Sequence, residues 1–286
     1  MLPFNSVTVS QDNGESSGGE GSPLCALRRE MATPLLACHG NLDAATVGLI
    51  EEALEWIGQA ESLTLLLSSR GGRVLSAYRV ALLLRERHPT IRMLVPRRAR
   101  SAATLLALAA DSIALGEFGE LGPLDASILV QPFPTDGVLR LSASDAPYLR
   151  RIAREWFPAG LDGLVSGLPG NAAGIGTLIG MYRTEELVTQ LAIRILQSVR
   201  EPLPKDAIDS VVDRLVHGYA SHDYPILRTE ARAIGLPIER VSDAHEPLLR
   251  AAEHQIAQLS AGRQEQRAVV IAGRSDYEWK VYQVGE

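Results

Sequence analysis

The chain has 286 residues, of which 46% are hydrophobic and 22% charged, and its formal net charge is -6. This balance is typical of a globular protein, and the length allows one large α/β domain with appendages or two modest domains. The acidic charge argues against a nucleic-acid partner, and no apolar run approaches the roughly 20 residues of a membrane span. Cys25 and Cys38 match no metal or redox spacing, so we expect reduced thiols in a cytoplasmic protein that uses no metal or cofactor.

Strands and helices alternate along the first half of the chain. Residues 1–23 are rich in Gly, Ser, Asn, Asp and Glu and predict a disordered leader. Apolar runs predict strands at residues 34–39, 63–67, 91–95 and 112–115, and helical spacing predicts helices at 44–60, 74–88 and from Ser101 onward. This order indicates an α/β fold whose parallel sheet carries its ligand site where strands end and helices begin.

The pattern becomes mainly helical beyond Asp125. Residues 131–143 suggest a loop or hairpin, and residues 268–271 and 279–282 suggest a terminal hairpin. Helices are expected at 145–156, 178–199, 205–217, 228–234 and 248–259. The chain would then divide into a leader (1–23), a core (24–130), a helical continuation of the same domain (131–247) and a C-terminal helix and hairpin (248–286). The helix at 178–199 has more apolar positions than a lone surface helix needs, which fits either simple packing against the sheet or a homo-oligomer.

Ser101 stands between small residues at the expected first turn of an apolar helix. It could simply cap that helix, which is a routine use of serine. It could also be a nucleophile, because a helix start offers free N–H groups and a positive field to a developing oxyanion. Gly71 and Gly72 follow the neighbouring strand, where they form either a tight turn or a second source of N–H donors.

Three runs of residues together resemble the serine dehydrogenase proteinase family. They are residues 65–72 (Leu-Leu-Leu-Ser-Ser-Arg-Gly-Gly), 95–104 (Val-Pro-Arg-Arg-Ala-Arg-Ser-Ala-Ala-Thr) and 119–125 (Gly-Glu-Leu-Gly-Pro-Leu-Asp). The run 221–226 (Ser-His-Asp-Tyr-Pro-Ile), with residues 230–231 and 235–236, extends the similarity to residues 33–241. This family groups with signal peptide peptidase A and the Clp protease proteolytic subunit in the Clp/crotonase fold.

The resemblance implies a parallel sheet of repeated β-α units with helical C-terminal additions, acting on a peptide or protein substrate. It implies Ser101 as nucleophile and an oxyanion hole from N–H groups near Gly71, Gly72 and Ala102. The chain departs from the family at Arg70, where relatives commonly have proline. That change keeps the glycines and adds a cation at the edge of the site.

The proton acceptor for Ser101 is harder to identify. Enzymes of the signal peptide peptidase A type use lysine, and this chain has only Lys205 and Lys280, both in surface-like contexts. The Clp proteolytic subunit uses a histidine some twenty-five residues after its serine, where this chain has no histidine. His222 is the best candidate because histidine side chains ordinarily titrate near neutrality, although it could also be a cap or loop residue that positions the following helix. Asp125 or Asp223 could orient it, but Asp125 could equally tie down the Gly-Pro turn, and that structural role is slightly favoured.

These residues predict a serine peptidase-like hydrolase that cleaves peptide bonds through Ser101. The missing lysine leaves open a silent or partner-regulated scaffold of the same fold. A crotonase-type acyl-CoA enzyme shares the oxyanion geometry, but the sequence shows no strong signal for its acidic base or for a CoA pocket.

Overall fold

An eight-stranded sheet forms the centre of the computed structural model, which describes residues 7–10, 21–125, 127–130, 139–142, 171–260, 268–276 and 278–284. The strand order is β1-β13-β12-β2-β3-β4-β6-β11, and the strands from β2 to β11 run parallel. These parallel strands are β2 (Leu35–His39), β3 (Ser62–Ser68), β4 (Thr90–Val95), β6 (Ser112–Leu115) and β11 (Ile238–Arg240). Strands β1 (Val7–Ser10), β12 (Val269–Gly273) and β13 (Trp279–Val284) pair antiparallel at the other edge.

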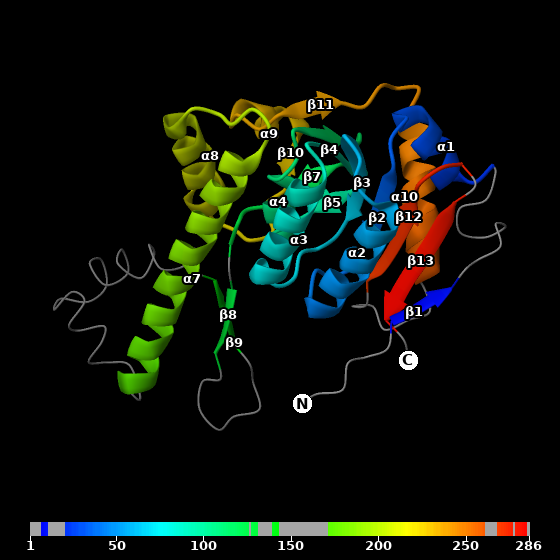
Figure 1. Ribbon diagram of the computed structural model, residues 1–286. Helices are drawn as coiled ribbons and strands as arrows, with labels where there is room; N and C mark the ends of the chain where they lie inside the picture. The colour runs from blue at the N-terminus through cyan, green and yellow to red at the C-terminus, as the bar shows by residue number, and fades with distance from the viewer. Residues whose placement is uncertain are drawn as a thin grey trace.

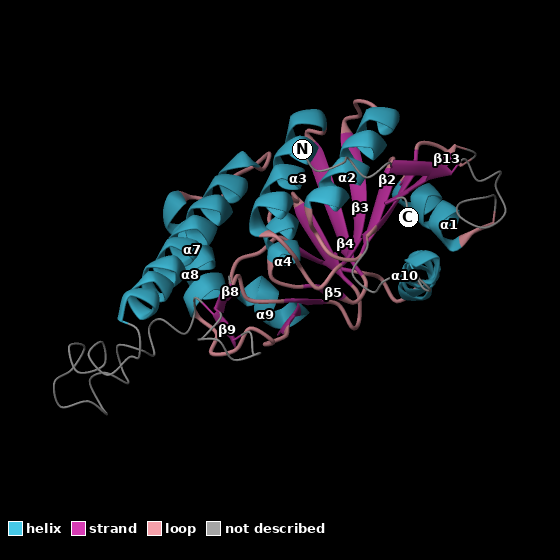
Figure 2. Ribbon diagram, turned by 90° about the horizontal axis from the view of Figure 1, so that it is seen from below, coloured by secondary structure: helices cyan, strands magenta, loops and turns pink. Residues whose placement is uncertain are grey.

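Helices cover both faces of the sheet, which is why its strands are apolar on both sides (Figure 2). One face carries α2 (Ala44–Ile57), α3 (Val74–Arg87) and α4 (Ala102–Ala107), and the other carries α1 (Pro23–Met31) and α10 (Glu246–Ser260). Successive strand residues point to opposite faces. Leu65 and Leu67 therefore pack under α3 and α4, while Leu66 packs on the α1 and α10 side.

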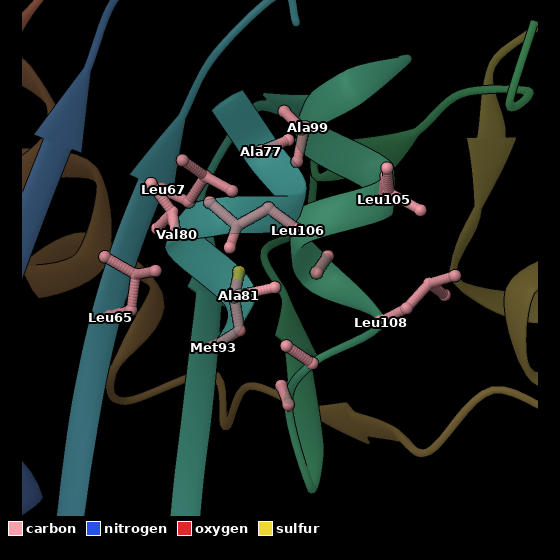
Figure 3. Packing of buried hydrophobic residues seen from close by; sticks show 14 of the residues in the cluster. Leu65, Leu67, Ala77, Val80, Ala81, Met93, Ala99, Leu105, Leu106 and Leu108 are labelled. Carbon is pink, nitrogen blue, oxygen red and sulfur yellow. The ribbon is translucent and has the colours of Figure 1, made fainter. Parts of the chain in front are cut away.

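The α3 and α4 layer is the packing that holds the region around Ser101 (Figure 3). Leu65, Leu67 and Met93 of the sheet meet Val80 of α3 and Leu106 of α4, and all five are fully buried. Two further helices, α7 (Asn171–Ser198) and α8 (Lys205–His217), lie side by side beyond α3 and extend the same core (Figure 1). Within the described segments, no helix is long and apolar enough to cross a membrane.

The structure confirms the strands and helices predicted for the first half of the chain, with shifts of a few residues at their ends. The prediction of a disordered leader over residues 1–23 is wrong at two places. Val7–Ser10 forms β1, an edge strand on β13, and α1 begins at Pro23 after Ser22, whose Oγ accepts from the N–H of Cys25. Alternating Val and Thr suit an extended edge strand, and Ser followed by Pro is a helix-start signal that composition alone conceals.

Agreement is also close in the second half, where the described residues allow a comparison. Helix α7 begins earlier than the expected 178–199 and ends one residue before it, and α8 matches 205–217. Helices α9 (Arg228–Ala233) and α10 match the last two expected helices to within two residues at their ends, and β12 and β13 form the expected terminal hairpin. The helix expected at 145–156 lies outside the described residues. Strands β8 (Ser127–Val130) and β9 (Leu139–Ser142) pair antiparallel across the expected hairpin at 131–143.

Three very short strands have no counterpart among the predicted elements. They are β5 (Arg98–Ala99), β7 (Glu120–Leu121) and β10 (Ile226–Leu227), which form a small sheet in the order β10-β7-β5. Two residues are too few to show a period, so this sheet has no sequence signal. In this sheet β7 lies between β10, which follows the loop of His222, and β5, which precedes Ser101.

Asp111 ties three elements together at the opposite end of the sheet. One carboxylate oxygen accepts from the Arg85 guanidinium of α3 at 2.7 Å and from the N–H of Ile91 in β4 at 2.7 Å. The other accepts from the N–H of Arg200, just after α7, at 2.8 Å. Because Arg85 is only 9% exposed, this ion pair is largely shielded from water.

Replacing this carboxylate should destabilise the fold. We expect Asp111→Asn to lower the free energy of unfolding by about 2–4 kcal/mol, because the nearly buried Arg85 loses its counter-charge. Urea unfolding followed by circular dichroism measures this change. Asp243→Asn is the matched control, because Asp243 pairs with Arg240 on the surface and is 87% exposed. An equal loss of stability in both variants would contradict the assignment.

Candidate active site

Ser101 has an unusual backbone conformation at the sharp turn from β5 into α4. Its φ is 53° and its ψ is -120°, and among the described non-glycine residues only Ala32, at the end of α1, shares a positive φ. Such a conformation costs about 1–3 kcal/mol and is found mainly at functional sites. The hydroxyl forms no capping hydrogen bond, so the simple helix-cap interpretation is wrong.

The Gly71–Gly72 turn lies directly against Ser101. A Cβ atom added at Gly71 would lie 2.8 Å from the carbonyl oxygen of Arg100 and 3.0 Å from the Cβ of Ser101. A Cβ atom at Gly72 would lie 2.3 Å from the carbonyl oxygen of Leu42. Both glycines also have positive φ values, 114° and 145°, so no other residue fits either position without strain. The backbone therefore approaches the serine more closely than a side chain would allow.

Of the three N–H groups predicted for an oxyanion hole, those of Gly72 and Ala102 are free to donate. Neither has a hydrogen-bond acceptor in the described part of the chain, and Ala102 N lies 3.3 Å from the place that a Gly71 Cβ would take. The N–H of Gly71 was also expected to contribute, but it donates to Ser69 Oγ at 3.1 Å. That bond holds the turn in shape and removes Gly71 from the set of free donors.

Asp125 and Ser101 line the same small cleft. The side chain of Asp125 is only 1% exposed. Its loop is anchored by the neighbouring residue, since the N–H of Leu124 donates to the carbonyl oxygen of Leu215 in α8 at 2.9 Å. The cleft is lined by Val74, Ser101, Ala102, Leu105, Leu124, Asp125 and Val188. Its walls are thus mostly apolar, with one hydroxyl and one carboxyl group.

His222 comes from a distant loop and faces Asp125. Its Nδ1 lies 3.5 Å from Asp125 Oδ2, and this nitrogen is buried with no hydrogen-bond partner among the described residues. This distance is slightly too long for a hydrogen bond, and contacts of this kind at catalytic sites often shorten when substrate binds. An imidazole held through Nδ1 keeps Nε2 for a proton from a substrate or nucleophile.

Asp223, the other expected orienting acid, points elsewhere. Its Oδ1 lies 3.4 Å from Arg100 Nη1. The same guanidinium contacts Glu120 Oε1 through Nη2 at 2.7 Å and through Nε at 2.8 Å. Arg100 thereby joins the residue before Ser101 to the residue after His222. Asp223 thus has a structural contact, and Asp125 is the carboxylate that meets the histidine.

Neither lysine reaches this site. Lys205 starts α8 and pairs with Asp209 on the surface, and the hydrogen bond to Asp209 raises its pKa, the opposite of what a general base needs. Lys280 lies in β13, with its Nζ 5.3 Å from the centre of the Trp56 ring. In the described segments, no group of three or more His, Cys, Asp or Glu is arranged to hold a metal ion.

Thr104 is a structural residue of the site that the sequence analysis did not single out. It is fully buried, and its Oγ1 donates to the carbonyl oxygen of Ala99 at 2.6 Å while accepting from the N–H of Gly122 at 3.0 Å. One hydroxyl thus joins the strand before Ser101 to the loop that carries Asp125. A threonine in an apolar helix is the only sequence signal for this role, and it is a weak one.

Removing this hydroxyl should loosen the Asp125 loop. We expect Thr104→Val to lower the free energy of unfolding by about 1–3 kcal/mol, because the shape is kept while two buried groups lose their partner. Hydrogen exchange at Gly122 should accelerate, as measured by mass spectrometry. Thr104→Ser retains the hydroxyl and should stay close to the parent. Unchanged hydrogen exchange at Gly122 in the valine variant would contradict the proposed role of the Thr104 hydroxyl.

Comparison with known proteins supports the resemblance seen in the sequence. Residues 49–146 match the family model of the ClpP-like SDH-type serine proteinases. The matched segment contains Ser101, both glycines and Asp125, and it ends before His222. This match confirms the resemblance.

Two uncharacterized proteins of Methanocaldococcus jannaschii are related to the chain. One is 27% identical over 192 residues, which cover 66% of this chain and 58% of the relative. The other is 22% identical over 176 residues, which cover 62% of this chain and 51% of the relative. The chain thus spans little more than half the length of these curated relatives.

Solved structures of proteases are also similar. The 1510-N membrane-bound stomatin-specific protease is 13% identical with a TM-score of 0.43, and the match covers 75% of this chain and 81% of that one. ClpP1 from Listeria monocytogenes is 13% identical with a TM-score of 0.40, covering 77% and 98%. The ClpP catalytic domain from Plasmodium falciparum is 10% identical with a TM-score of 0.39, covering 73% and 84%. Similarity this weak assigns no function.

Proposed function

We propose that this chain is a serine peptidase-like hydrolase that cleaves peptide bonds through Ser101. The observation that carries the proposal is the strained Ser101 backbone, set between the free N–H groups of Gly72 and Ala102 and the buried carboxylate of Asp125. A serine without a capping role, at a turn that only glycines can approach, is the arrangement that acyl transfer requires.

In the proposed reaction, Ser101 Oγ attacks the peptide carbonyl carbon while His222 Nε2 takes the hydroxyl proton. Asp125 holds the imidazole through Nδ1 and stabilises its positive charge. The N–H groups of Gly72 and Ala102 bind the negative oxygen of the tetrahedral intermediate. His222 then gives its proton to the leaving amine, and water releases the acyl group from Ser101 by the same sequence in reverse.

The cytoplasmic location and the homo-oligomeric state stay predictions from the sequence and belong to this proposal. Sedimentation analysis of the purified chain tests the second of them. A single protomer mass at micromolar concentration would contradict it.

Removing the nucleophile should abolish hydrolysis. We expect Ser101→Ala to lower kcat/KM for a quenched fluorescent peptide by at least about 10³-fold, because no other group can form the acyl-enzyme. Ser242→Ala is the control, since Ser242 is an exposed serine whose side chain has no bond in the described structure. Hydrolysis that persists in Ser101→Ala would reject the mechanism. Parent protein that hydrolyses no peptide would favour the scaffold hypothesis.

The two neighbouring aspartates separate an orienting role from a structural one. We expect Asp125→Asn to lower kcat by about 10²–10⁴-fold, with little change in KM, because the imidazole loses its carboxylate. His222→Gln should lose a similar factor. Asp223→Asn should change kcat by less than about tenfold, since Asp223 contacts Arg100 instead of the imidazole. A larger loss of kcat in Asp223→Asn than in Asp125→Asn would show that Asp125 is not the residue that orients the imidazole.

A further inference from the structure

We propose that Arg70 and Arg73 give this site a preference for peptides that carry a carboxylate close to the scissile bond. This inference rests on the proposed peptidase function and names its substrate class. It starts from the position of the two arginines, which immediately flank the Gly71–Gly72 turn on either side.

The turn between the two arginines is fixed in place. On one edge it pairs with Leu42, whose N–H donates to Gly71 O at 2.8 Å and whose carbonyl oxygen accepts from Arg73 N at 2.7 Å. On the other edge it lies against Ser101. A carbonyl group bound by the Gly72 N–H would therefore lie within the reach of both guanidinium groups, since Arg73 is adjacent and Arg70 is about 7 Å away along the chain.

Both guanidinium groups are exposed and uncommitted. In the described part of the chain neither the Arg70 nor the Arg73 side chain has a hydrogen bond or an ion pair, although the chain has more acidic residues, 34, than basic ones, 28. Nearby Arg100 differs from them, because its guanidinium forms ion pairs with two carboxylates. Arginines on this chain's surface commonly find a carboxylate, as do Arg79, Arg92, Arg214, Arg240 and Arg250.

The carboxylates described around the turn are already engaged. Asp43 caps α2 by accepting from the N–H of Thr46 at 2.9 Å. Glu120 and Asp223 share Arg100, and Asp125 faces His222. A carboxylate on the substrate is therefore the group that these two cations lack. Arginine suits this role, because its planar guanidinium binds a carboxylate through two parallel hydrogen bonds.

Peptide binding to the Ser101→Ala variant tests this preference without requiring turnover. The probes are two fluorescein-labelled peptides of one sequence with amidated C-termini, differing only in two central Glu or Gln residues. An exposed ion pair changes affinity by up to about fivefold, so we expect the Glu peptide to bind about three- to tenfold more tightly. Raising the salt from 0.05 M to 0.5 M should reduce this ratio.

Arginine variants assign the preference to the two residues. Adding Arg70→Gln and Arg73→Gln to Ser101→Ala should bring the Glu-to-Gln affinity ratio close to one. Arg194→Gln is the matched control, because Arg194 is an exposed arginine of α7 without a partner in the described structure, and it should leave the ratio unchanged. A ratio near one in Ser101→Ala, or a preference that survives both arginine substitutions, would overturn the inference.

A second pair of probes identifies the source of the carboxylate. Gln peptides with a free or an amidated C-terminus test whether a terminal carboxylate serves as well as a side chain, and either preference supports the inference if it requires Arg70 and Arg73. Peptide hydrolysis by the parent protein is measured separately. Absent hydrolysis with an arginine-dependent binding preference would contradict the proposed function alone, whereas hydrolysis without any preference would contradict only the role of the arginines.

Discussion

The close approach of the Gly71 backbone to Ser101 is the constraint on which the rest of the site depends. Any side chain at position 71 would collide with Arg100 O and Ser101 Cβ. The turn can therefore lie against Ser101 only if residue 71 is glycine. This contact brings the N–H groups of two consecutive β-α units to the same edge of a parallel sheet. Functional groups gather at that edge because strands end and helices begin there.

The strained backbone of Ser101 is tolerated because hydrogen bonds and packing on both sides of it fix its conformation. Thr104 fixes the start of α4 to Ala99 and Gly122, and the buried layer of α3 and α4 keeps the helix on the sheet. Arg100 then joins this rigid turn to the loop of His222. The contacts that hold Ser101 therefore also hold the loop of His222, the residue proposed as its proton acceptor.

Much of the fold could be predicted from sequence because buried parallel strands are continuous apolar runs. Residues 63–67 are an example of such a run. The end of this β-α unit's strand is also visible, because Gly71 interrupts the pattern. The sequence indicates Asp125 and Asp223 alike as partners of His222 and cannot distinguish them, since the contact depends on β7 and β10, which are two residues long and have no period. Sequence also could not show that Ser69 Oγ occupies the Gly71 N–H, because that bond follows from the folded turn. Arg70 was visible as a departure from the family, but its lack of a partner was not.

Covalent labelling tests the central claim, that Ser101 is an activated nucleophile, most directly. The chain would be treated with a fluorophosphonate and the modified residue located by mass spectrometry of its peptides. The account predicts one adduct, on Ser101, forming much more slowly after His222→Gln because the hydroxyl then lacks its proton acceptor. An adduct on another serine, or labelling of Ser101 at an equal rate without His222, would contradict it.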